Sequence, residues 1–62
     1  MKKWFFKHFV DDKGINTVIG LMKFLNDNGI APGEFIVIDF NLNSSSGPAS
    51  LSCIYYAECE LN

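Results

Sequence analysis

The spacing of apolar residues changes along this chain, and the changes restrict the folds that it can adopt. The segments 34–43, EFIVIDFNLN, and 51–61, LSCIYYAECEL, alternate two sets of side chains, as β-strands do. Residues 15–28 instead repeat apolar positions at the three- and four-residue spacing of a helix. The aromatic-rich segment 3–10 is predicted to be a further strand, and turns are predicted at 11–14 and 30–33. The order is therefore strand, helix, strand, strand.

This order predicts an α+β fold with two layers, in which residues 1–62 form a single domain. One crossover helix makes the first two strands parallel, and the last strand runs back as a hairpin. If that strand lies in the middle, all neighbouring strands are antiparallel, so we prefer the sheet order 1-3-2 to 1-2-3. Residues 43–50, NSSSGPAS, are small and turn-forming, and they are predicted to be a mobile hairpin loop.

The helix is expected to place one apolar stripe on the sheet. That stripe consists of Ile15, Val18, Ile19, Met22 and Leu25, and it is widened by Leu21 and Phe24. Polar residues including Thr17 are expected on the opposite side. Gly20 suggests close packing on the sheet, and Gly29 is expected to end the helix in a left-handed conformation.

The two faces of the sheet are both rich in apolar residues. In the first strand Lys3 and Lys7 indicate a wetter side, so Trp4, Phe6 and Val10 are assigned to the helix side. The other two strands are expected to add one alternate set each to this side: Ile36, Ile38, Phe40, Leu42, Leu51, Cys53, Tyr55, Ala57 and Leu61. The helix-free face is then expected to carry Phe5, Phe9, Phe35, Val37, Ile54 and Tyr56. Such a face exceeds the few hundred Å² of apolar surface that a monomer usually leaves bare, so these six residues are predicted to bind a partner.

Size and charge restrict the classes of function. A chain of 62 residues builds a marginal core and usually needs a disulfide, a metal or a partner. Five Lys, no Arg and a formal net charge of −2 disfavour nucleic-acid binding. Lys7 and His8 interrupt the apolar start too early for an export signal, and no segment offers the roughly 20 apolar residues of a membrane span. We expect a cytoplasmic protein that does not bind membranes.

Few residues in the sequence suggest catalysis or metal binding. Cys53 and Cys59 lie roughly 20 Å apart along one strand, too far for a disulfide between them. Their spacing is also wrong for a zinc site, and His8 is the only histidine. We expect no enzyme, no metal and no cofactor.

The segments FLNDNGI, EFIVIDFNLNSS and SCIYYAE resemble those of a family of tiny sporulation-associated proteins of Bacillus. The resemblance covers about two-thirds of the chain and rests mainly on the strand pattern. It implies a small cytoplasmic protein and no catalytic residue.

Three functions are compatible with these features. The preferred one is a non-enzymatic protein-interaction module that forms a homodimer through the apolar sheet face. The second is an inhibitor encoded by a phage or prophage that blocks a host enzyme, such as a defence nuclease. The third is a single-stranded nucleic-acid binder that stacks bases on the open sheet.

Overall fold

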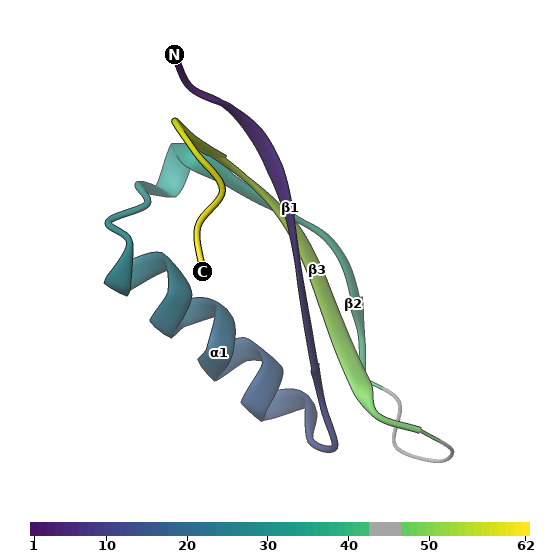
Figure 1. Cartoon of the computed structure of the whole chain (residues 1–62). Helices are drawn as coiled ribbons and strands as arrows, with labels where there is room; N and C mark the ends of the chain where they lie inside the picture. Colours follow the sequence, from purple (N-terminus) through teal and green to yellow (C-terminus); the bar gives the residue numbers. More distant parts are fainter. Residues whose placement is uncertain (43–46) are drawn as a thin grey trace.

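The computed structural model describes residues 1–42 and 47–62, and it has the predicted order of elements. They are β1 (Lys3–Asp11), α1 (Gly14–Asp27), the 3₁₀ turn η1 (Pro32–Glu34), β2 (Phe35–Asn41) and β3 (Ala49–Ala57). The sheet order is β1-β3-β2 with both pairs antiparallel, which confirms the predicted α+β two-layer fold (Figure 1). The predicted hairpin loop at 43–50 includes residues 43–46, which lie outside the described part of the chain.

Local hydrogen bonds and one glycine set the limits of α1. The Asp11 carboxylate accepts hydrogen bonds from the Lys13 backbone N–H at 3.1 Å and from the Asn16 amide at 3.0 Å. These bonds stabilise the ionised form and hold the pKa of Asp11 below its ordinary value. At the other end Gly29 has a φ of +63°, which confirms the predicted left-handed stop.

The helix presents a different side to the sheet from the one predicted. Thr17, Leu21 and Phe24 are its buried side chains, whereas Ile15 and Met22 are exposed. Thr17 can be buried because its hydroxyl donates a hydrogen bond to the Gly14 carbonyl at 2.6 Å. The predicted stripe is confirmed at Leu21 and Phe24 and, partly buried, at Val18 and Leu25. Its placement of Ile15, Ile19 and Met22 against the sheet, and of Thr17 opposite, was wrong.

The core lies between α1 and the central strand. Ala49, Leu51, Cys53 and Tyr55 alternate along β3, and all four are buried on the side of the helix. They agree with the predicted helix side of this strand. Gly20 lets the helix approach β1, because a Cβ there would lie 3.3 Å from Cδ1 of Phe9.

The last strand is shorter than predicted. It ends at Ala57 rather than Leu61, and the following residues turn back towards α1 (Figure 1). There the Leu61 N–H donates a hydrogen bond of 2.8 Å to the hydroxyl oxygen of Tyr55. The buried Tyr55 hydroxyl thus has a hydrogen-bond partner in the backbone of the tail. The alternation of residues along a strand cannot predict this bond, so the strand was predicted to continue to Leu61.

The two sides of β1 are reversed relative to the prediction. Lys7 pairs with Cys53 and therefore points to the helix side. Its ammonium lies 5.1 Å from the ring centroid of Phe24 and 5.9 Å from that of Phe9. A lysine can occupy this position because its stem packs on apolar surface while its charge interacts with aromatic rings. Consequently Trp4, Phe6 and Val10 face away from the helix, not towards it.

A β-bulge changes the alternation within β2. Val37 pairs with Cys53 and Asp39 with Ser52, so Ile38 has no partner in the described pairing. Before the bulge, Ile36 faces away from the helix, contrary to the prediction. After the bulge, Phe40 pairs with Leu51 and lies on the helix side, as predicted.

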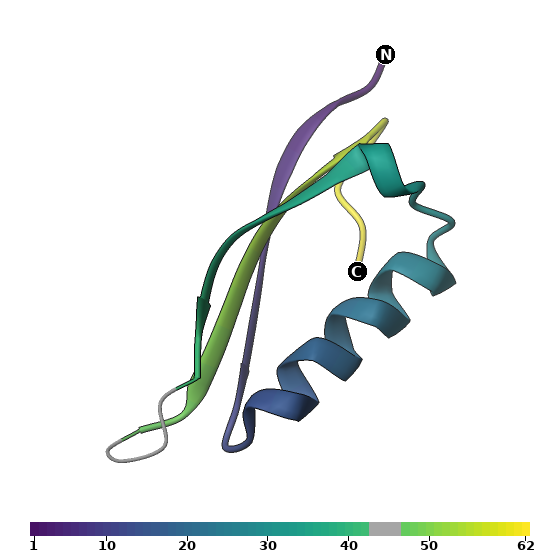
Figure 2. The same cartoon turned by 180° about the vertical axis from the view of Figure 1, so that it is seen from behind.

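The helix covers only part of the sheet. It contacts β1 and β3, while β2 bows away from it in the middle of its length (Figures 1 and 2). The molecule is elongated, at 42 × 18 × 17 Å, and its radius of gyration is 12.0 Å. A compact domain of this length is expected to have about 10.6 Å. In the described part of the chain, no helix has the length and apolar character needed to cross a membrane.

The orientation of α1 can be tested with two neighbouring substitutions. We expect Leu21→Ala to lower the free energy of unfolding by about 2–5 kcal/mol, because it leaves a cavity against β3. Met22→Ala should change it by less than about 0.5 kcal/mol, because this side chain is exposed. Urea unfolding followed by circular dichroism measures both. Equal losses would show that the helix packs on another side.

Candidate functional site

The sheet surface that faces away from α1, here called the outer face, contains two apolar rows. Residues that pair across antiparallel strands point to the same side of the sheet. Trp4 pairs with Tyr56 in one row. In the next row, Ile54 lies between Phe6 and Ile36. These five side chains form one continuous apolar surface over all three strands.

The apolar rows are well exposed. The exposed fractions are 47% for Trp4, 56% for Phe6, 52% for Ile36 and 36% for Tyr56. The Trp4 and Tyr56 rings also contact each other, with centroids 5.1 Å apart. Single exposed apolar residues are ordinary, but a continuous group of this size is typical of an interaction surface.

The outer face becomes polar towards the other end of the sheet. The next row, here called the polar row, has Ser52 between His8 and Asp39. Nδ1 of His8 lies 2.8 Å from the Ser52 hydroxyl, a hydrogen bond that orients the ring. The row beyond it consists of Val10, Ser50 and Asn41.

The polar row contains the residue types of a hydrolytic triad, but in a different order. In such a triad the histidine lies between the serine and the carboxylate, which holds the imidazole in place. Here Ser52 lies between His8 and Asp39, so the Asp39 carboxylate stands on the far side of the serine. The arrangement presents an imidazole ring and a carboxylate on the same side of the sheet.

The predicted partner-binding residues are divided between the two sides of the sheet. Ile54 and Tyr56 lie on the outer face, as predicted. The other four lie on the helix side, in register with buried residues of β3: Phe5, Phe9, Phe35 and Val37. The assignment of Phe5 and Phe9 to the helix-free face was wrong because Lys7 lies beneath the helix. That of Phe35 and Val37 was wrong because the bulge in β2 reverses the alternation after Val37.

Two of these reassigned residues belong to the aromatic packing of the core. The Phe5 ring stacks on Tyr55 at 5.7 Å, and the Phe9 ring meets the edge of Phe24 at 6.0 Å. Such pairs add to the stability gained from burying the rings. Phe5 and Phe9 therefore pack against other rings of the same chain and do not belong to the outer face.

Sequence reasoning missed three members of the apolar rows: Trp4, Phe6 and Ile36. The prediction did find that a helix-free face of this sheet is rich in aromatic and aliphatic residues. The missing information was the phase of β1 for Trp4 and Phe6, and the bulge in β2 for Ile36. The sequence did contain a signal for the correct phase of β1. Phe5 and Phe9 lie two residues before and after Lys7, on the same side of the strand, which is typical of a lysine that packs beside aromatic rings.

The two cysteines are both free, and they differ in their surroundings. Cys53 is buried under α1, whereas Cys59 is exposed in the tail. Burial raises the pKa of the Cys53 thiol, an effect that the nearby Lys7 ammonium partly opposes. Within residues 1–42 and 47–62, no three His, Cys, Asp or Glu side chains are grouped closely enough to hold a metal ion.

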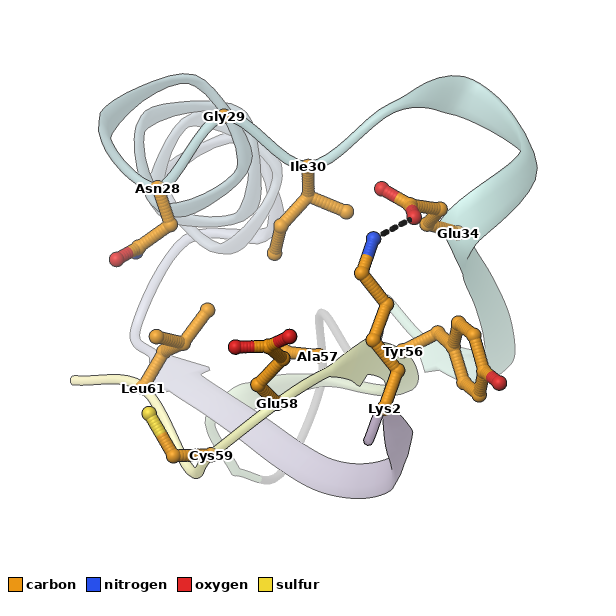
Figure 3. A pocket seen from close by; sticks show the side chains of 10 residues that line it. All are labelled: Lys2, Asn28, Gly29, Ile30, Glu34, Tyr56, Ala57, Glu58, Cys59 and Leu61. Atoms are coloured by element: carbon orange, nitrogen blue, oxygen red, sulfur yellow. Dashed lines mark hydrogen bonds and ion pairs between the residues drawn. The ribbon is translucent and has the colours of Figure 1, made fainter.

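A pocket of about 210 Å³ lies at the end of the molecule, between the end of α1, the start of β2 and the tail (Figure 3). The ion pair between Lys2 and Glu34 closes one side of it. This contact raises the pKa of Lys2 and lowers that of Glu34. Because both groups are solvent-exposed, the pair is a weak constraint on structure.

No protein-family model, no curated protein and no solved structure matches this chain. The resemblance to the sporulation-associated proteins therefore stays a prediction.

The environments of the two cysteines predict a simple labelling result. A thiol reagent should react quickly with Cys59 in the folded protein and with Cys53 only after unfolding, because Cys53 is buried and its raised pKa keeps it protonated. The Cys59→Ser variant should give no fast reaction. Fast labelling of that variant would contradict the described packing of β3.

Proposed function

We propose that this protein is a non-enzymatic protein-interaction module that forms a homodimer through its outer face. The observation that carries the proposal is the exposure of the apolar rows. Fully burying one large apolar side chain contributes about 1.5–3 kcal/mol, and the four well-exposed side chains of these rows have exposed fractions of 36% to 56%, so each gains roughly half of that on association. A few such burials equal the whole stability expected of so short a chain, about 3–5 kcal/mol. Association would therefore contribute strongly to the folded state.

The need for such a contribution follows from the small core. Its fully or nearly fully buried apolar residues are Leu21, Phe24, Ala49, Leu51, Cys53 and Tyr55. Domains of this size usually add a disulfide, a metal or a partner. Both cysteines are free, so no disulfide stabilises the single chain, and association through the outer face would supply the missing burial.

A second copy suits this face because the face carries both a hydrogen-bond donor, the His8 imidazole, and an acceptor, the Asp39 carboxylate. Closed dimers use the same surface on both subunits, so that surface must be complementary to itself. The outer face combines an apolar area with a row that holds one imidazole and one carboxylate. A different protein, such as the host enzyme of the inhibitor hypothesis, would instead leave the purified chain monomeric.

Single-stranded nucleic acid is the alternative that the aromatic rings favour. Trp4, Phe6 and Tyr56 are exposed on an open sheet, where bases can stack. The net charge of −2 and the Asp39 carboxylate on the same face oppose phosphate binding. We therefore place this function below self-association.

Two adjacent substitutions on β2 test the proposed dimer. We expect Ile36→Lys to convert a dimer into a folded monomer of 7.0 kDa, because it introduces a charge into the apolar rows. Val37→Lys is the matched control: this neighbour is similarly exposed but lies on the helix side. Light scattering across micromolar to millimolar concentrations gives the mass, and circular dichroism confirms folding.

A wild-type protein that stays monomeric at millimolar concentration would refute the homodimer. Loss of the dimer in Val37→Lys alone would place the interface on the other side of the sheet. Quenching of Trp4 fluorescence by oligothymidylate, strongest at low salt, would favour the nucleic-acid alternative instead.

A further inference from the structure

The polar row offers a donor and an acceptor at opposite edges of the sheet. His8 lies on β1 and Asp39 on β2, with β3 between them. Since Nδ1 of His8 is engaged by Ser52, the Nε2 atom is left to meet an external group. If the Ser52 hydroxyl donates to Nδ1, the neutral ring carries its proton on Nε2 and donates outward. Asp39 is exposed and can accept such a bond.

If the strands of the two copies are aligned, as they are in one of the two common classes of sheet packing, a two-fold axis can stack the outer faces in two ways. An axis parallel to the strands places β1 of one copy over β2 of the other and keeps every row over its own equivalent. Phe6 then meets Ile36 of the second copy, and Ile54 meets Ile54. His8 meets Asp39 of the second copy, twice by symmetry.

An axis perpendicular to the strands gives a different pairing. It places β1 over β1 and β2 over β2, so His8 can never face Asp39. If the polar rows overlap at all in this arrangement, they bring histidine against histidine and carboxylate against carboxylate. The first axis pairs a hydrogen-bond donor with an acceptor, whereas the second can only oppose like groups, so the polar row distinguishes between the two axes.

The dimensions of stacked sheets suit the first arrangement. Packed sheets lie roughly 10 Å apart, a gap that opposed histidine and aspartate side chains can bridge with one hydrogen bond. The second apolar row and the polar row are adjacent, on either side of the bulge in β2.

Resting on the proposed homodimer, we propose that the two copies stack with their strands parallel, each His8 bonded to Asp39 of the other copy. The partner of the outer face is then a second copy in one defined orientation. The apolar rows supply most of the affinity, and the polar row selects the orientation.

Mixing two variants tests this orientation. His8→Glu sets two carboxylates against each other in its homodimer, and Asp39→Lys sets a lysine against a histidine. Each should weaken the homodimer by about tenfold. In the mixed dimer, however, the introduced carboxylate meets the introduced ammonium at one contact, and the native Asp39 meets the native His8 at the other. We expect native mass spectrometry of an equimolar mixture to show the mixed dimer in clear excess over a statistical distribution.

The matched control is Asn41→Lys, which places the new ammonium one row further along β2, over Val10 of the second copy. Mixed with His8→Glu, it should give no excess of mixed dimer. A wild-type dimer that Ile36→Lys disrupts, combined with purely statistical mixing of His8→Glu and Asp39→Lys, would overturn this orientation and leave the proposed function standing. A monomeric wild type would overturn both.

Discussion

The side of β1 that faces the helix determines how the rest of the molecule is arranged. Lys7 and its odd-numbered neighbours lie under α1, with the Lys7 ammonium 5.1 Å from the Phe24 ring centroid, and the register with β3 then sets the direction of the neighbouring side chains. Phe5 and Phe9 complete the aromatic core, while Trp4 and Phe6 are turned towards solvent. Lys7, which the sequence suggested would be solvated, therefore packs its side chain beneath the helix.

The order of elements and the sheet topology could be predicted because they depend on periodicity and chain connectivity. Residues 15–28 have a helical period and residues 34–43 a strand period, and one crossover with one hairpin leaves few topologies. The prediction of the central strand was right on its buried side, where Leu51, Cys53 and Tyr55 alternate without interruption. Gly29 was equally informative, because its left-handed conformation is a local property.

The faces of β1 and β2 could not be predicted in the same way. In β1, aromatic residues occupy both sides, so the phase depended on interpreting Lys7 as solvated. In β2, the bulge at Ile38 shifts the alternation halfway along, and the unbroken alternation of the sequence through this residue conceals the shift. The orientation of α1 was mispredicted because Thr17 was treated as a polar, exposed residue. Its hydroxyl donates a hydrogen bond to the Gly14 carbonyl of the same helix, so the side chain can be buried. The presence of an apolar outer face was predictable, while the identity of its residues needed coordinates.

The bulge at Ile38 has a further consequence for how the molecule avoids uncontrolled growth. β2 forms one edge of the sheet and is rich in β-branched residues, a composition that favours the addition of foreign strands. The extra residue interrupts the regular spacing of outward N–H and C=O groups, so an incoming strand cannot form a continuous ladder along this edge. The bulge therefore makes fibre-like polymerisation along the edge of β2 unfavourable. Association through the outer face is not affected by it.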